Sequence, residues 1–191
     1  MTFKIDESYR LKKLAAFAAG AKNVLDIGCS QYPNIYLKNE SVTGLDINPG
    51  RVPGNYTRFV TGNLALLLEE KKTYEAIVAG EVLEHVENPL KFLKECNQLL
   101  EKEGLLILST PNPHSIIEFF LTLLINKKYF YTKDHVMIYP QRWLIRLLDL
   151  SGFTNTLLFS GGFPLPPLGL IPFPRSLCYQ TIAVCRKKGE I

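Results

Sequence analysis

Two carboxylates and an imidazole stand close together in the middle of the chain, in the run Glu81-Val-Leu-Glu84-His85. If this run forms a helical turn, the i, i+3 and i+4 spacing places all three side chains on one face. Such a set suits general acid–base catalysis or a divalent metal site. His135 is a candidate to join the set from a later loop, and His114 is a weaker candidate beside the same pocket.

A second set of residues has the spacing of a nucleotide site. The apolar run 23–29 ends in a glycine turn, the run 42–46 ends in a carboxylate, and Asp46 lies 18 residues beyond Gly28. In a βαβ unit the first strand-to-helix turn receives the cofactor, and an acidic residue roughly 20 residues later binds the ribose hydroxyls. The spacing therefore predicts an adenosyl cofactor.

Both sets need a scaffold, and the hydrophobic pattern indicates alternating strands and helices. Strand patterns occupy 23–28, 42–46, 57–60, 74–80 and 105–108, with weaker ones near 154–159 and 179–185. Helix patterns run from an N-cap at Asp6 to a stop at Gly20, from near Pro33, from Asn88-Pro89 to a stop at Gly104, and from about Pro140 to Ser151. This alternation predicts an α/β fold with a doubly wound, mostly parallel sheet and helices on both faces.

The bulk properties indicate one ordinary folded domain. A chain of 191 residues can bury a sizeable core, and its net charge of +4 comes from scattered basic residues, which argues against a nucleic-acid partner. Its four cysteines lack metal-type spacing, which favours reduced thiols. Charged residues near the N-terminus argue against secretion, and the longest apolar run, 119–125, is shorter than the roughly 20 residues of a membrane span. A soluble cytoplasmic protein is expected.

Five pieces of the chain occur in register: 24–29, Asp46, 74–80, 81–85 and 106–112. Together they resemble the class I S-adenosylmethionine-dependent methyltransferases. The resemblance is nearest to the methyltransferase type 11/23-like subgroup that includes ubiquinone-biosynthesis O-methyltransferases. It runs from about 22 to 113, with a weaker echo at Asp134-His135 and at 147–153.

The resemblance implies a Rossmann-like sheet of seven strands with an antiparallel last strand, and S-adenosylmethionine as cofactor. It also implies a single methyltransferase domain over 1–191. This domain would consist of an N-terminal helix (1–21), a cofactor-binding half (22–113) and an acceptor-binding half (114–191).

Carried over position by position, the resemblance gives nine expected cofactor contacts. Asp26, Gly28 and Cys29 in the first turn would lie under the methionine moiety, and Asp46 and Ile47 at the end of the second strand would meet the ribose. Asn63 and Leu64 would lie along the adenine, and Gly80 and Glu81 would contact the cofactor from the end of the fourth strand. Ser30 and Tyr32 stand where the family turn usually has glycines. Because dinucleotide enzymes need those glycines for the pyrophosphate, this departure argues against a nicotinamide dehydrogenase.

The prediction for the chemistry is that His85 and His135 are catalytic and that no metal is bound. Glu-x-x-Glu-His elements with a later histidine serve as metal ligands in small-RNA 3′-terminal 2′-O-methyltransferases. An RNA 2′-O-methyltransferase with a metal at Glu81, Glu84, His85 and His135 is therefore one alternative. A non-catalytic cofactor-binding or scaffold module, motivated by the lost glycines, is another.

The acceptor half contains two apolar segments, 119–125 and the proline-rich stretch 163–174. Each is either a wall of a substrate pocket or ordinary packing, and the first also has the composition of a helix that lies on a membrane surface. Together they indicate an apolar or amphipathic acceptor, with peripheral membrane contact left open. The expected function is methyl transfer to a small-molecule or lipid-like acceptor, at oxygen.

Overall fold

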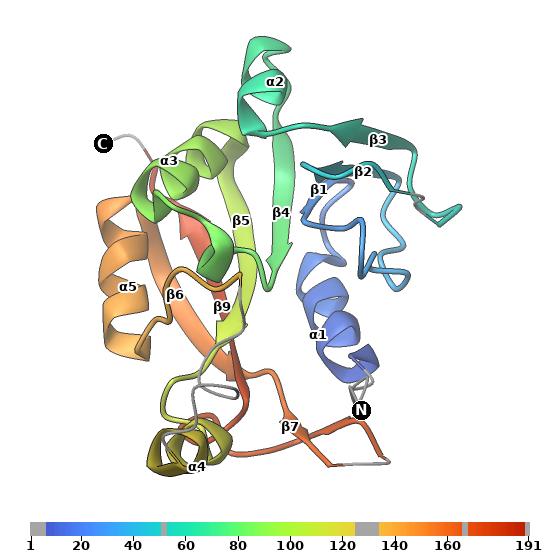
Figure 1. Ribbon diagram of the computed structural model, residues 1–191. Helices are drawn as coiled ribbons and strands as arrows, with labels where there is room; N and C mark the ends of the chain where they lie inside the picture. Colours follow the sequence, from blue (N-terminus) through green and yellow to red (C-terminus); the bar gives the residue numbers. More distant parts are fainter. Residues whose placement is uncertain (1–6, 51–52, 125–133, 166–167, 190–191) are drawn as a thin grey trace.

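A seven-stranded sheet forms the centre of the computed structural model, which describes residues 7–50, 53–124, 134–165 and 168–189 (Figure 1). The strand order is β3-β2-β1-β4-β5-β9-β6. The seven strands are β1 (Asn23–Ile27), β2 (Ser41–Asp46), β3 (Arg58–Thr61), β4 (Tyr74–Gly80), β5 (Leu100–Pro111), β6 (Phe153–Ser160) and β9 (Gln180–Lys187). Two further short strands, β7 (Phe163–Pro164) and β8 (Leu170–Ile171), pair with each other beyond the sheet.

The strand directions confirm the predicted topology. The pairs β1–β2, β1–β4, β2–β3 and β4–β5 are parallel, and β9 is antiparallel to both β5 and β6. Central parallel strands are covered on both faces and so read as continuous apolar runs. In β1 and β4 nearly every residue is buried. This arrangement brings the carboxyl ends of β1, β2, β4 and β5 to one edge of the sheet.

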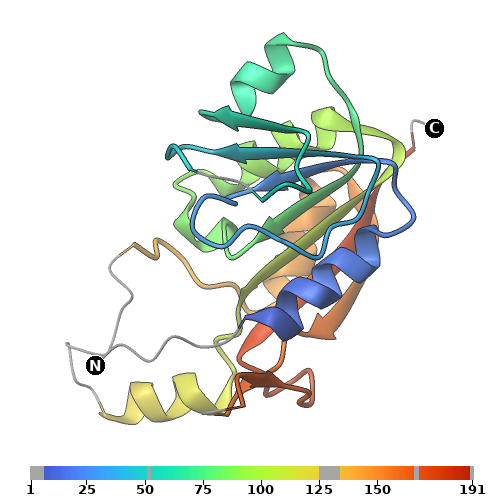
Figure 2. The ribbon, with the colours of Figure 1, turned by 90° about the vertical axis from the view of Figure 1, so that its right-hand side faces the viewer.

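Helices cover both faces of the sheet, as predicted (Figure 2). Helix α1 (Ser8–Ala18) packs on one face, where Leu14, Ala15 and Ala18 enter the core. The opposite face carries α2 (Leu64–Glu69), α3 (Pro89–Leu99) and α5 (Gln141–Leu150). Helix α4 (Ile116–Leu124) lies beside the β7–β8 pair at one end of the molecule (Figure 1). None of the described helices is long and apolar enough to cross a membrane.

The helix predicted from near Pro33 is wrong, because the chain between β1 and β2 forms turns only. The cause is Asn34, a buried residue whose polar groups are used by long-range contacts. Its side chain donates to Leu11 O at 3.0 Å, and its backbone amide donates to the Tyr56 hydroxyl at 2.8 Å. Because asparagine side chains compete with helical backbone bonds, this network replaces a helix.

The structure also differs from the sequence predictions in several element boundaries. Helix α3 begins at its predicted Asn88 cap, whose side chain accepts from Lys91 N, but it ends at Leu99 rather than near Gly104. Leu100 is extended and pairs with Tyr74 as part of β5. The proline-rich stretch contains the β7–β8 pair instead of only loop, and α2 was not predicted at all. The predicted cap Asp6 lies outside the described residues, and the helix there has Glu7 at its N-cap position.

Candidate active site

The glycine turn after β1 and the carboxylate at the end of β2 meet as predicted. Gly28 has φ +76°, and a Cβ added to it would lie 2.5 Å from Val82 Cγ2, so no other residue fits this position without strain. The Asp46 carboxylate accepts hydrogen bonds from Ser30 N at 2.9 Å and Asn48 N at 2.8 Å. These bonds fix both oxygens of Asp46 beside the turn, with lone pairs left for a ligand.

A buried polar network supports the turn from below. Asp26 is 4% exposed and accepts hydrogen bonds from the Tyr56 hydroxyl and from Asn34 N. Burial raises the pKa of Asp26 to about 6, against the opposing effect of the Tyr56 hydrogen bond. The Cys29 thiol is also buried, which raises its pKa to about 12 and keeps it protonated, so Cys29 is not a nucleophile here.

A small cavity opens between the turn and α1, with a volume of about 10 Å³, room for roughly one water molecule. Arg10, Asp26, Gly28, Tyr32 and Gly80 are among the residues that line it. Arg10 is 3% exposed, and its guanidinium donates to Glu7 Oε2 at 2.7 Å and to Ser109 Oγ at 3.1 Å. A buried cation therefore borders the turn where the methionine end of the cofactor is expected.

Glu81 belongs to this side of the site, which corrects the expectation that Glu81, Glu84 and His85 share one helical face. The 3₁₀ turn η1 (Leu83–His85) begins only after Glu81, and Glu81 itself has a left-handed backbone with φ +56°. The Ser109 hydroxyl donates to Glu81 Oε1 at 2.8 Å. Burial raises the pKa of Glu81, and the nearby Arg10 charge opposes this effect. Glu81 is thus bonded to Ser109, which also accepts from Arg10, and it does not share a helical face with His85.

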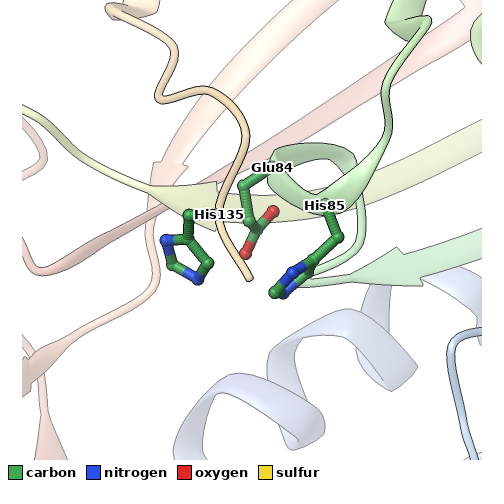
Figure 3. A group of neighbouring side chains, drawn as sticks. All are labelled: Glu84, His85 and His135. Atoms are coloured by element: carbon green, nitrogen blue, oxygen red, sulfur yellow. The ribbon is translucent and has the colours of Figure 1, made fainter. Parts of the chain in front are cut away.

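Glu84, His85 and His135 form a second group, in which one ligand atom from each residue lies within 4.8 Å of the others. Figure 3 shows the Glu84 carboxylate between the two imidazole rings. The rings are 4.8 Å apart and nearly perpendicular. His85 is exposed, His135 is half-buried and Glu84 is fully buried. The sequence-predicted meeting of His85 with His135 is therefore present, and His114 is exposed and does not belong to this group.

Backbone bonds bring His135 to this place. Val136 N and Met137 N both donate to Glu84 O, at 2.7 and 3.2 Å, and Tyr139 Oη donates to Leu83 O at 3.3 Å. Residues 134–139 are thereby hydrogen-bonded across η1 and form a strap over it. His85 Nδ1 lies 2.8 Å from Asp134 O, so Nδ1 carries the proton of a neutral ring and Nε2 has the free lone pair.

The electrostatics of the group distinguish its members. Neither oxygen of Glu84 has a hydrogen-bond partner among the described residues; the Thr110 hydroxyl is near but does not meet hydrogen-bond geometry. Burial, and secondly the charge of Glu81, raise the pKa of Glu84 to about 9. Burial and then His85 lower the pKa of His135. One carboxylate with two imidazoles is also a set that suits zinc, manganese or ferrous iron.

The family model described as "Methyltransferase domain" matches residues 5–158, most of the chain. The chain belongs to the methyltransferase domain family. The match confirms the prediction that the chain is a class I S-adenosylmethionine-dependent methyltransferase. It also confirms S-adenosylmethionine as the cofactor.

Two similar known proteins are both ubiquinone biosynthesis O-methyltransferases, and both are longer than the region they share with this chain. The ubiquinone biosynthesis O-methyltransferase of Coxiella burnetii is 26% identical over 157 residues, 69% of this chain and 66% of that protein. Its counterpart in Cereibacter sphaeroides is 32% identical over 102 residues, 47% and 41% of the two chains. The chain thus spans less than two-thirds of the length of either relative.

The fold is shared with a solved methyltransferase of Thermotoga maritima, described as a possible histamine N-methyltransferase. Its TM-score is 0.75 at 18% identity, with 95% of this chain and 89% of that chain covered. At this identity the likeness concerns the fold.

The remaining predicted contacts of the methyltransferase domain lie along the same sheet edge. Ile47 is 75% exposed directly after Asp46, a position from which an apolar side chain can cover a base. Asn63 caps α2, its side chain accepting from Ala65 N at 3.1 Å, and Gly62 N donates to Asp46 O. The Leu64 side chain is buried in the core. A contact from Leu64 to adenine is therefore restricted to its backbone.

Sequence reasoning missed Arg10 and Ser109. Both are buried at the cavity or next to it, and Arg10 donates to Ser109, which in turn donates to Glu81. Arg10 had one detectable signal: it is a cation among the apolar positions of an amphipathic helix, where a charge is buried only with partners. Ser109 is one of many serines at strand ends, and its role depends on β4 and β5 being neighbours.

Proposed function

We propose that this methyltransferase domain transfers the methyl group of S-adenosylmethionine to a hydroxyl oxygen of a small, apolar or amphipathic acceptor. The observation that carries the proposal is the position of the Glu84–His85–His135 group. Glu84 and His85 follow Gly80 and Glu81 by only a few positions, after the end of β4, and His135 joins them from a later segment. The O-methyltransferase names of the two curated relatives support oxygen as the acceptor atom.

Cofactor binding is assigned to the turn side of the site. The Arg10 guanidinium is placed to pair with the carboxylate of the methionine moiety, and Asp46 to accept hydrogen bonds from the ribose hydroxyls. Ile47 would cover the adenine. This assignment needs the small cavity to widen when the ligand enters, and the half-exposed Tyr32 at its wall is the side chain with room to move.

The reaction is an in-line displacement on carbon. The acceptor oxygen forms a bond to the methyl carbon, the carbon–sulfur bond breaks, and S-adenosylhomocysteine leaves. A hydroxyl acceptor must also lose its proton, and His85 Nε2 is the free basic atom in the group. The protein otherwise supplies alignment and exclusion of water, since the sulfonium is already activated.

Exposed apolar side chains on two segments of the acceptor half support an apolar acceptor. Val136, Met137 and Ile138 directly follow His135 and are 56%, 47% and 38% exposed. On α4, at the end of the molecule beside the β7–β8 pair, Phe119, Phe120 and Leu123 are between 57% and 60% exposed. Exposed apolar surface of this kind often marks a binding region.

The proposal is tested with a series of phenols that carry alkyl chains of increasing length, incubated with methyl-labelled S-adenosylmethionine. We expect methyl ethers as products and a KM that falls as the chain lengthens, by at most about fourfold per added buried CH₂. Matching anilines serve as controls for the acceptor atom. Methylation confined to the anilines, or a KM independent of chain length, would overturn the oxygen or the apolar part of the proposal respectively.

A metal-assisted reaction is the second candidate, and the orphaned Glu84 carboxylate between two imidazoles favours it. Glu84, His85 and His135 would hold a divalent ion, which would lower the pKa of a bound hydroxyl. Glu81, the fourth ligand of the RNA-methylating alternative, is bonded to Ser109 instead. Dialysis against a chelator separates the candidates: unchanged activity excludes the metal, and lost activity restored by Mn²⁺ or Zn²⁺ supports it.

A further inference from the structure

The two edges of the sheet are unequal. One edge strand, β3, has four residues, and short edge strands are a common way to prevent unwanted pairing. The other, β6, has eight residues and pairs only with β9. A long unpaired edge is a template for another extended chain. The surroundings of β6 therefore show whether this edge is shielded or open.

A groove of about 530 Å³ lies along the outer side of β6. Four consecutive strand residues, 156–159, line it together with Ile145 of α5. Successive side chains of a strand point to opposite faces, so a groove lined by all four must pass over the edge itself. Phe159 packs on Phe17 under the α1 face, whereas Leu158 packs against the core on the α5 face.

The outer edge of β6 has two carbonyls that already accept side-chain hydrogen bonds, and it has an amide that can still donate. Arg175 Nη1 donates to Leu158 O at 3.4 Å, and Lys13 Nζ donates to Ser160 O at 2.8 Å. Because alternate residues of an antiparallel strand direct both backbone groups to the same side, Leu158 and Ser160 present their polar groups outward. The amide N–H of Leu158 thus faces the groove.

The groove combines apolar surface with positive charge. Leu157 is 60% exposed and Ile145 39% exposed. Arg142 and Arg175 line the same groove, and neither has an acidic partner among the ion pairs of the described residues. Arg142 lies over the Trp143 ring at 5.5 Å, which leaves its charge available to a ligand.

We propose that the edge of β6 binds an extended segment of a partner protein, with alternating acidic and apolar side chains, as an added strand. Backbone bonds to the Leu158 amide would supply affinity, acidic side chains would pair with Arg142 and Arg175, and apolar ones would cover Leu157 and Ile145. A second copy of this chain fits less well. An edge-to-edge dimer is isologous, so it would bring the two arginines of each copy against the same patch of the other.

The test uses a fluorescein-labelled octapeptide of alternating valine and glutamate, with fluorescence anisotropy at low salt as readout. A valine–lysine octapeptide and a valine–glutamate octapeptide with N-methyl groups on one edge are the control peptides. We expect the first to bind at least about tenfold more tightly than either control. The double variant Arg142→Glu, Arg175→Glu should lose about tenfold in affinity. Arg146→Glu, an exposed reversal on the same helix that pairs only with Asp149, should not.

Three results would overturn the proposal. Equal binding of the N-methylated peptide would show that no strand is added, and equal binding of the lysine peptide would show that the arginines do not select charge. A concentration-dependent dimer in light scattering that Leu157→Asp abolishes would assign the edge to a second copy. Unchanged S-adenosylmethionine binding by the double variant shows that the variant is folded, so a lost peptide signal is interpretable.

Discussion

The proposed cofactor side, which includes the Gly28 turn and Asp46, and the proposed acceptor side, the Glu84–His85–His135 group, are built in opposite ways. On the cofactor side, polar atoms are paired within the protein: Asp46 with two backbone amides, Asp26 with Tyr56 and Asn34. On the acceptor side, Glu84 is buried and neither of its oxygens has a hydrogen-bond partner in the described part of the chain, while Val136, Met137 and Ile138 are exposed. The polar groups of the first half are already paired without a ligand, and the Glu84 carboxyl of the second is not.

The difference has a physical explanation. The cofactor always has the same structure, so a site whose groups are already held in place binds it with a smaller loss of conformational entropy. An unpaired buried carboxyl costs free energy in the free protein and recovers it when a donor, proton or cation arrives. The acceptor side is therefore where ligand binding should change stability and titration most.

The largest expected effect comes from His85→Gln, which acts on the acceptor side alone. Loss of the Nε2 base should lower kcat by about 10²- to 10⁴-fold while the Kd for S-adenosylmethionine stays unchanged. Methyl-transfer rates and calorimetry measure the two quantities. His114→Gln, an exposed histidine outside the group, is the matched control and should retain full activity. A His85 variant with normal kcat would restrict His85 to a structural role.

On the cofactor side the corresponding change is Asp46→Ala. It removes the acceptors for the ribose and should weaken cofactor binding by roughly 1.5–3 kcal/mol. Asp46→Asn keeps one oxygen for the Ser30 amide and should lose less. Calorimetric titration with S-adenosylhomocysteine measures both. If the alanine variant binds as tightly as the natural protein, Asp46 does not belong to the site.

The cofactor side was also the more predictable from sequence. The strands β1, β2 and β4 were predicted to within about one residue because they are short apolar runs ending in glycine or aspartate. The meeting of Gly28 with Asp46 follows from parallel pairing of neighbouring strands. Helix α2 had a usable signal too, in the Asn63 cap before an apolar run.

What sequence could not give depends on contacts between distant segments. Glu81 leaves the helical face because its left-handed backbone is held by Ser109 from the next strand. Asn34 replaces a helix because it bonds α1 and Tyr56. Local propensity has no information on such partners, and the same is true of the strap that places His135 on η1.

Glu84→Gln tests whether the acceptor side is unsatisfied. A pKa raised to about 9 means that the folded protein holds a proton on Glu84 at pH values where the unfolded chain has released it. Its contribution to stability is therefore fully present below about pH 4 and lost as pH rises toward 9. The variant cannot ionise at this position. Its free energy of unfolding, measured by thermal denaturation, should therefore match that of the natural protein at pH 4 and exceed it at pH 8 by roughly 1–3 kcal/mol.

Added Mn²⁺ sharpens the same comparison. A metal binds the ionised carboxylate, so a bound ion should stabilise the natural protein at pH 8 and leave the Glu84→Gln variant unchanged. If the difference in melting temperature between the variant and the natural protein stays the same from pH 4 to pH 8, the Glu84 carboxylate already has a hydrogen-bond or ionic partner. The contrast between the two sides would then disappear.

The smallest expected effect is that of Ile47→Ala on the cofactor side. Ile47 is 75% exposed, so its truncation should leave the melting temperature unchanged, since little core packing is lost. If the side chain covers the adenine, the cofactor loses an apolar contact and its Kd should rise by about threefold to tenfold. Leu66→Ala on α2 removes a side chain that is 42% exposed and serves as the control. Equal Kd values for the two variants would remove Ile47 from the adenine site. A loss of affinity for S-adenosylhomocysteine without a loss for methionine alone would place its contact on the nucleoside.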